Sequence, residues 1–258
     1  MSRVLLIGET AEDVYHYGRC PRLSPEAPVP VFHRIETVVR EGMAANVRAN
    51  LEAFGHEVVF ITNPEPFVRT RYVDIIADYQ LLRVDENPVV RPIEYPKPDG
   101  FDMVVISDYN KGLIPNLYSV ATKFPVTRVT IDTKRAALIE QGNVLVKCNS
   151  TEMDAIESGI HCRPHRYIET LGAGGARWQG VHYVTDSVPV SDVTGAGDTF
   201  LAALVHYQLQ LDRVTDAGIA LAIDYANAAA GIAVQHRGTY VLTAADIQRL
   251  DSRAQSAR

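Results

Sequence analysis

The sequence of 258 residues predicts an α/β protein in which a parallel sheet covered by helices carries a smaller β-rich appendage. From residue 101 onward, short apolar runs alternate with helical patterns, an order typical of a parallel sheet with helices on both faces. Two β-rich segments, at about 10–40 and 69–90, interrupt this alternation and predict the appendage. The length suffices for one large core or two small ones, and we expect a single domain over 1–258.

The amino-terminal part predicts buried strands, one helix and the strands of the appendage. Residues 4–7 and 58–62 are short apolar runs, as expected of buried strands. Residues 43–54 have helical spacing of their apolar positions, and Gly55 ends the pattern. Further strands are expected at 31–39, 69–77 and 79–85, the last two joined as a hairpin, and the proline-rich stretch 87–100 is expected to be a surface connection.

The carboxyl-terminal part predicts the rest of the sheet and most of its helices. The expected strands are 103–107, 129–132, 145–147 and 168–171, with two more within 181–190. The expected helices are 114–123, one between 132 and 145, then 199–210, 215–234 and one that begins at Thr243.

Composition and charge bear on where the chain works and what it binds. It carries 25 Lys and Arg against 31 Asp and Glu, a net charge of −6 that does not favour nucleic acid or anionic lipid. No uncharged apolar run reaches membrane-spanning length, and the first residues, MSRVLLIGE, are too soon interrupted for a signal peptide. Three scattered cysteines, Cys20, Cys148 and Cys162, argue against a disulfide framework. We therefore expect a cytoplasmic protein that binds neither nucleic acid nor membrane.

The segment DVTGAGDTF, at 192–200, is a glycine-rich turn at the start of an apolar helix. The backbone N–H groups of Gly195, Ala196 and Gly197, together with the helix dipole, would form an anion site. An aspartate in such a turn repels phosphate, unless it accepts the proton of an attacking hydroxyl while the amides stabilise a transferring phosphoryl group. Asp198 is the candidate for that base, and the alternative is a simple helix cap.

DVTGAGDTF resembles the second signature of the ribokinase-like (PfkB) carbohydrate kinases. The resemblance implies a three-layer sandwich with a mostly parallel central sheet and a small β lid. It also implies that ATP and Mg²⁺ are cofactors and that Asp198 is the base, and it leaves the use of a monovalent cation open. The sequence contains no GxxxxGK[ST] motif, so a P-loop enzyme is excluded.

Other segments resemble further motifs of the same family. EGMAANVRANLEAFG resembles the first signature, which implies that Gly42 and Asn46 bind the sugar. Asn149 and Glu152 resemble the NxxE motif, with Glu152 reaching the metal ion through water, although the same pair could form a helix capping box. The positions that resemble the nucleotide site are Thr170, Gly172, Gly175, Asn227 and Gly238.

SPEAPVP and ISDYNKGLI are similar to segments of the heptose-7-phosphate kinases, the kinase half of the bifunctional ADP-heptose synthesis protein. This similarity implies phosphorylation of D-glycero-D-manno-heptose 7-phosphate to the 1,7-bisphosphate, and a homodimer formed through the lid. Asp13, Asp108 and Lys111 are then candidate substrate ligands, with a local ion pair as the alternative for the last two. Lys134 would reach a phosphate of the nucleotide, or remain solvated.

The appendage hairpin also carries Arg71 and Arg83, whose guanidinium groups suit a substrate phosphate but are equally common on exposed strands. Residues 161–165, HCRPH, lack a second ligand pair, and we interpret them as an exposed loop rather than a metal site.

Three departures from the family pattern concern the substrate side. Gly42 is followed by Met43 rather than by a second glycine, and Gly8 is followed by Glu9 rather than by aspartate. Asn63 runs almost directly into 66–72, where relatives carry a further helix and strand. The alternatives are therefore a kinase of another sugar or a nucleoside, or a catalytically silent protein that binds nucleotide or sugar.

Overall fold

The computed structural model describes all residues except 98, 126, 138, 140–141, 161–165 and 257–258. Its main feature is an eight-stranded sheet in the order β12-β11-β10-β9-β8-β7-β1-β4. These strands are β1 (Arg3–Gly8), β4 (Glu57–Ile61), β7 (Met103–Asp108), β8 (Arg128–Thr133), β9 (Val144–Asn149), β10 (Tyr167–Thr170), β11 (Ala176–Trp178) and β12 (Val181–Tyr183). Six of them run parallel, and β11 and β12 are antiparallel. The expected mostly parallel sheet is confirmed.

Helices cover both faces of this sheet and give three layers. Helices α1 (Ala44–Ala53), α4 (Ala196–Leu209) and α5 (Asp216–Ala233) pack on the face that carries Val4 and Leu6. Helices α2 (Tyr118–Lys123) and α3 (Ser150–Ile160) lie against the face that carries Leu5 and Ile7. Because both faces are buried, the strands are continuous apolar runs rather than alternating ones. The last helix, α6 (Ala244–Ser256), packs beside α5 through Leu250.

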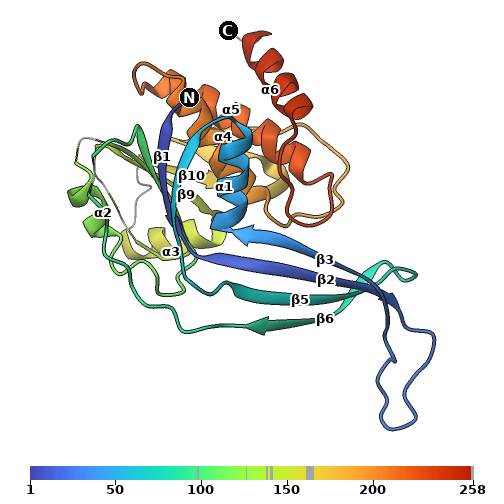
Figure 1. Cartoon of the computed structure of the whole chain (residues 1–258). Helices are drawn as coiled ribbons and strands as arrows, with labels where there is room; N and C mark the ends of the chain where they lie inside the picture. The colour runs from blue at the N-terminus through green and yellow to red at the C-terminus, as the bar shows by residue number, and fades with distance from the viewer. Residues whose placement is uncertain (98, 126, 138, 140–141, 161–165, 257–258) are drawn as a thin grey trace.

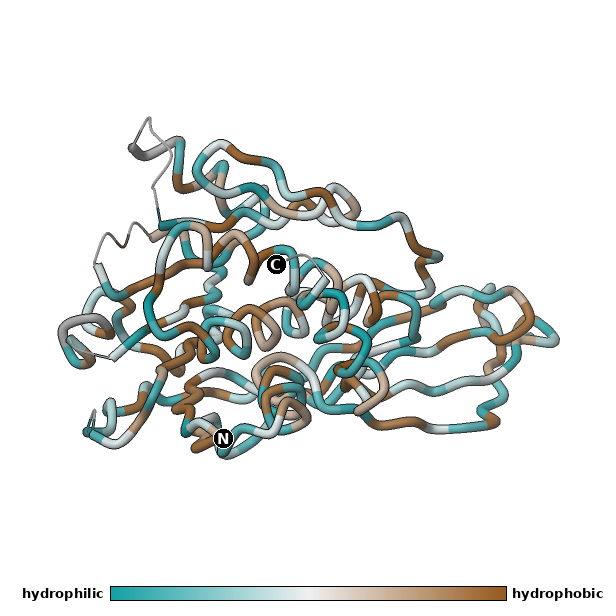
Figure 2. Tube along the Cα trace, turned by 90° about the horizontal axis from the view of Figure 1, so that it is seen from above, coloured by the Kyte–Doolittle hydropathy of each residue, from teal (hydrophilic) through white to brown (hydrophobic). Residues whose placement is uncertain are grey.

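A second sheet projects from this body (Figure 1). It contains β2 (Thr10–Arg19), β3 (His33–Met43), β5 (Phe67–Asp74) and β6 (Tyr79–Glu86), in the order β3-β2-β5-β6. Along its strands, hydrophilic and hydrophobic residues alternate (Figure 2), so that one face differs from the other. Strand β3 leads directly into α1, which fixes one end of the second sheet to the body.

Two predicted helices differ from the structure. The helix expected at 114–123 begins only at Tyr118, because the side chain of Asn116 accepts the N–H of Tyr118 at 2.9 Å and turns the chain first. The helix expected between 132 and 145 does not form among the residues that are described there. Instead the Tyr167 hydroxyl donates to the Ala137 carbonyl and accepts the Ile139 N–H, so a side chain supplies partners that a helix would supply itself.

The expectation of two strands within 181–190 is also wrong, since only β12 lies there. The other antiparallel strand is β11, which Gly175 turns back toward β10 with a φ of 87°. Pro189 lacks the N–H that a ladder requires, and residues 184–190 follow an irregular course. Within the described part of the chain, no helix is long and apolar enough to span a membrane.

Candidate active site

Asp198 lies in the first turn of α4 and is only 4% exposed. The Tyr109 hydroxyl, from the loop after β7, donates to Asp198 Oδ1 at 2.6 Å. Asn46, in the first turn of α1, donates from Nδ2 to the Gly195 carbonyl at 3.4 Å, and its side chain also reaches Asp198. The structure thus brings together the predicted base, one predicted sugar ligand and a tyrosine that we did not predict.

The surroundings of Asp198 set its proton affinity. Burial raises the pKa of Asp198, and the nearby charge of Asp132 raises it further. The hydrogen bond from Tyr109, the charge of Lys147 and the hydrogen bond from Asn46 lower it. The resulting pKa is about 6. Burial also raises the pKa of Tyr109 well above its usual range, so this hydroxyl stays protonated and acts as a donor. Asp198 is therefore ionised at neutral pH and more basic than an exposed aspartate.

The glycine turn before Asp198 depends on its glycines. Gly195 is the N-terminal cap of α4 with a φ of 77°, and a Cβ there would lie 2.7 Å from Asn46 Nδ2. A Cβ on Gly197 would lie 3.0 Å from Lys147 Nζ, so this ammonium group is directly beside the turn. The Ala196 N–H donates to the Val193 carbonyl at 3.3 Å. Helix N-terminus and lysine together make the turn electropositive.

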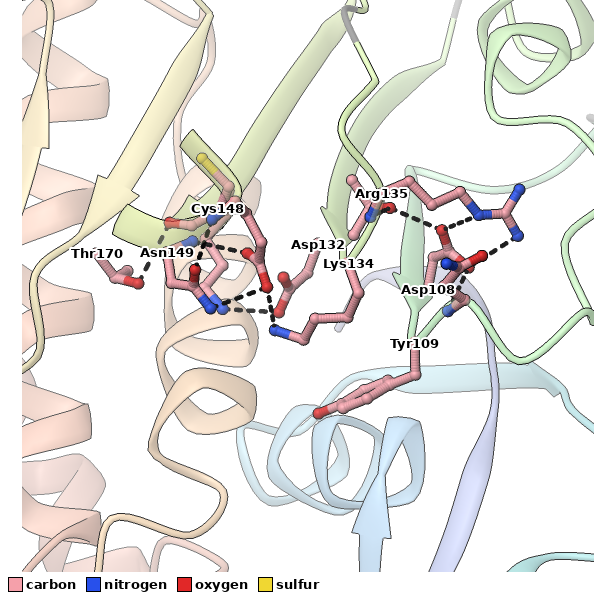
Figure 3. Close-up of polar contacts among 12 residues, drawn as sticks. Asp108, Tyr109, Asp132, Lys134, Arg135, Cys148, Asn149 and Thr170 are labelled. Carbon is pink, nitrogen blue, oxygen red and sulfur yellow. Dashed lines mark hydrogen bonds and ion pairs between the residues drawn. The ribbon is translucent and has the colours of Figure 1, made fainter. Parts of the chain in front are cut away.

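Charged side chains gather at the carboxyl ends of β8 and β9 and just after them. Lys147 pairs with Asp132 at 2.7 Å, and both side chains are buried. Lys134 reaches Glu152 Oε1 at 2.7 Å (Figure 3). Lys134 is therefore paired with Glu152, although its side chain is still 34% exposed to solvent.

Asn149 and Glu152 form the capping box that was the alternative to a metal role. Glu152 Oε2 accepts the Asn149 N–H at 2.7 Å, and Asn149 Oδ1 accepts the Glu152 N–H at 2.9 Å. The described residues contain no cluster of three His, Cys, Asp or Glu side chains suited to a metal ion. However, Asp132 Oδ1 is buried without a hydrogen-bond partner. This oxygen and Glu152 fit a hydrated Mg²⁺, which prefers few carboxylate ligands and keeps several waters.

The predicted sugar ligands of the second sheet are also in contact. A Cβ on Gly42 would lie 2.2 Å from Asp13 Oδ2, so glycine makes room for that carboxylate. Asp13 Oδ1 accepts a bond from Arg71 at 2.6 Å, and Arg71 stacks over the Tyr15 ring.

Asp108 and Lys111 do not pair with each other. The buried Asp108 carboxylate accepts from Thr133 at 2.7 Å and pairs with Arg135 at 2.9 Å (Figure 3). Lys111 Nζ lies 5.7 Å from the centre of the Phe67 ring. Thus Asp108 is engaged within the body, and Lys111 extends toward the second sheet.

Glu9, which replaces the expected aspartate, shapes the loop that carries Tyr109. Its buried carboxylate accepts the N–H groups of Tyr109, Lys111 and Leu113 at 2.8, 3.1 and 3.2 Å. Burial raises the pKa of Glu9, and these three bonds lower it in part. The position of Tyr109 against Asp198 therefore depends on an acid at the end of β1.

The predicted nucleotide residues lie near β12 and the glycine turn. Asn227 donates to the Tyr183 carbonyl at 2.9 Å, and a Cβ on Gly175 would lie 2.1 Å from that same oxygen. The Gly238 N–H donates to Asp192, which begins the segment with the glycine turn, at 2.8 Å. Gly172 has a φ of 58° in the turn after β10, and the Thr170 hydroxyl bonds to the Cys148 carbonyl.

Two sequence interpretations concern residues outside this site. Cys20 and Cys148 are free thiols, and burial raises the pKa of Cys148 above its usual range. Residues 161–165, which include Cys162 and were interpreted as an exposed loop, lie outside the described residues.

Comparison with known proteins points to carbohydrate kinases through a family model and a curated relative, and to a shared fold through solved structures. Residues 142–245 match the model of the pfkB family carbohydrate kinases. D-beta-D-heptose 7-phosphate kinase of Bordetella bronchiseptica is 30% identical, over 95% of this chain and 95% of that protein. Bifunctional protein HldE of Pseudomonas savastanoi is 28% identical over 98% of this chain, which spans 64% of that relative's length. The solved ribokinase of Arabidopsis thaliana, complexed with ribose and ATP, superposes with a TM-score of 0.69 at 15% identity, over 96% of this chain and 98% of that one.

Proposed function

Because this chain belongs to the pfkB family and is an ATP-dependent carbohydrate kinase, we propose that it transfers the γ-phosphoryl group of ATP to a sugar phosphate. The observation that carries the proposal is the Asp198 carboxylate, buried at the N-terminus of α4 with a pKa of about 6. Such a group is ionised at neutral pH and basic enough to take the proton of the attacking hydroxyl. The glycine turn and Lys147 would stabilise the charge that develops on the phosphoryl group.

The acceptor in this proposal is D-glycero-D-manno-heptose 7-phosphate, converted to the 1,7-bisphosphate. One relative, which this chain matches over 95% of both lengths, is named D-beta-D-heptose 7-phosphate kinase. Asp13, Gly42 and Asn46 would bind the sugar hydroxyls, since a buried polyol needs paired hydrogen-bond partners. Lys111, which extends toward the second sheet, would donate a hydrogen bond to the sugar. Asp108, which is paired with Arg135 in the body, would instead support the loop that carries Tyr109.

Nucleotide and metal ion would occupy the opposite side of Asp198. Lys134 would bind a phosphate of ATP, and the residues near β12, Gly175 and Asn227 among them, would border the base. Asp132 Oδ1 and Glu152 would hold Mg²⁺ directly or through water. When bound, Mg²⁺ neutralises charge on the β- and γ-phosphates.

The second sheet would act as a lid that excludes water during transfer. Arg40 of β3 already donates to the Thr239 carbonyl at 2.8 Å, which ties this sheet to the loop beside the catalytic turn. The face away from the site exposes Val39, Leu82 and Val84. A homodimer that covers this apolar face is part of the proposal, because unpaired strands with apolar side chains favour association. The free thiols of Cys20 and Cys148 favour a reducing compartment such as the cytoplasm.

The test is conversion of ATP to ADP across sugars, sugar phosphates and nucleosides, with Asp198→Asn beside the native chain. Asp212→Asn, at an exposed position outside the site, is the matched control. We expect turnover with heptose 7-phosphate, loss of turnover in Asp198→Asn, and ATP binding retained in both variants by calorimetric titration.

Other outcomes would change the proposal in defined ways. Near-native turnover in Asp198→Asn would remove Asp198 from the role of base. Turnover with a different acceptor would replace the heptose, and ATP binding without any turnover would favour a binding protein.

A further inference from the structure

One face of the second sheet gathers arginines around Asp13. Pairing aligns Asp13 with Arg69, Tyr15 with Arg71, and Arg71 with Arg83. Residues that are aligned, or two apart on one strand, share a face of a sheet, so these three arginines and Asp13 lie together with Arg40 of β3, which is also aligned with Asp13. Phe67 shares this face and packs against Met43 and Tyr109, so the face is turned toward Asp198.

Three of these four arginines already have strong partners. Arg40 donates to the carbonyls of Arg237 and Thr239. Arg71 pairs with Asp13 at 2.6 Å, with side chains only 9% and 2% exposed. Arg83 holds Asp85 with two bonds, Nε to Oδ1 at 2.6 Å and Nη2 to Oδ2 at 2.8 Å. Neither of these two carboxylates is bonded to Arg69, the fourth guanidinium group of this face.

Arg69 is the arginine of this face with the weakest partner. It forms no ion pair with any residue that the structure describes, although Asp85, held by Arg83, lies near enough to feel its charge. Its Nη2 lies 3.2 Å from the sulfur of Met43, and a thioether is a weak acceptor. A half-buried guanidinium with five donors and one weak partner is prepared to bind an anion.

The position of Arg69 identifies which anion. Its positive charge acts to lower the pKa of Tyr109, which holds the catalytic carboxylate, and Met43 opens the helix that carries Asn46. Arg69 therefore lies on the sugar side of Asp198, whereas Lys134 and Lys147 come from β8 and β9 on the body side.

We propose that Arg69 binds the phosphate group that the acceptor sugar already carries, and so selects sugar phosphates over free sugars. This inference rests on the proposed kinase activity and names the residue that recognises the substrate anion. Arg71 would hold Asp13 in place for the sugar hydroxyls instead of binding phosphate itself.

The test compares Arg69→Gln with native chain on a sugar phosphate and on the same sugar without phosphate, by kcat and KM for each. We expect Arg69→Gln to raise KM for the sugar phosphate about 10- to 100-fold, the range expected for a lost charge-assisted contact, with little change for the free sugar. Arg69→Lys should restore part of the preference. Arg34→Gln, the same substitution at an exposed position of the same sheet, should behave as native chain.

Each result is decisive. If native chain prefers the sugar phosphate and Arg69→Gln keeps that preference, the role of Arg69 is refuted while the kinase proposal stands. Equal losses in Arg34→Gln would indicate general electrostatic attraction and would also refute it. If the native chain itself does not distinguish the two sugars, both the proposed sugar-phosphate substrate and the proposed role of Arg69 are refuted. Should Arg69→Gln unfold, Arg69→Met, which also removes the charge, gives the same comparison by calorimetric binding of the sugar phosphate.

Discussion

Removing the Tyr109 hydroxyl tests whether a hydrogen bond tunes the base. In Tyr109→Phe the ring still fills its place beside Met43 and Phe67, but Asp198 Oδ1 loses the donor that lies 2.6 Å away. That donor stabilises the charged carboxylate and lowers its pKa. Its removal must therefore raise the pKa of Asp198 and move the acidic limb of the pH–rate profile to higher pH.

The size of the shift follows from the type of bond. A hydrogen bond to a charged group contributes about 1.5–3 kcal/mol, and about 1.4 kcal/mol corresponds to one pKa unit. We take the lower end, because water can replace part of the lost bond, and expect the pKa to rise from about 6 to roughly 7. The ionised fraction at pH 6 then falls from about one half to about one tenth, whereas at pH 8 it falls only from nearly one to about nine tenths.

The assay is kcat/KM for the sugar phosphate between pH 5 and 9, since this ratio reports groups of the free enzyme. We expect about a five-fold loss at pH 6 and nearly native rates at pH 8. Tyr118→Phe, at a tyrosine that is 52% exposed on α2, is the matched control. An unmoved acidic limb, or one moved to lower pH, would refute the tuning role. A loss of equal size at every pH would show that Tyr109 serves only to position the site.

Two further predictions concern the free energy of unfolding. Lys147→Met leaves Asp132 buried without its counterion and should lower the free energy of unfolding by about 3–5 kcal/mol, measured by urea titration. A decrease of less than about 1 kcal/mol would contradict a tight buried ion pair. Burial, and to a smaller extent the charge of His56, lowers the pKa of His206 to about 4. Below pH 6.5 the unfolded chain therefore binds a proton that the folded chain does not bind. The contribution of His206 to the free energy of unfolding is thus fully present above pH 6.5 and is lost as the pH falls. The urea titrations should therefore give about 2 kcal/mol less at pH 5 than at pH 7, with a flatter dependence in His206→Gln; equal slopes would contradict this assignment.

The sequence predicts the fold class and most elements because their signals are local. The apolar runs of β1, β7, β8 and β9 can be recognised as strands without knowledge of their neighbours, and the glycines at 195 and 197 mark the helix start that carries Asp198. The errors lie where a distant side chain decides the local conformation. The Tyr167 hydroxyl, far along the chain, replaces the expected helix between β8 and β9.

The same reason explains which site residues sequence patterns missed. Tyr109 and Lys147 act on Asp198 across separations of 89 residues and about 50 residues, which no local spacing reveals. Asp132 did have a signal, an acid at the carboxyl end of a buried strand, where ligands gather in parallel sheets. Conversely, the arginines at 71 and 83 have the right chemistry for a phosphate, but only the structure shows that carboxylates already occupy them.

The short connection after Asn63 lies away from the proposed catalytic centre around Asp198. In the structure β4 is the edge strand, and Asn63 closes the short link to β5 by accepting the Thr10 N–H at 2.8 Å and donating to the Thr10 carbonyl at 3.3 Å. Both bonds hold the start of β2, the strand that carries Asp13. Asp198, Lys147 and Asp132 come from α4, β9 and β8, several strands away from this edge. The shortness of this connection therefore bears on where the second sheet is anchored, and hence on the proposed sugar site, rather than on the proposed transfer of the phosphoryl group.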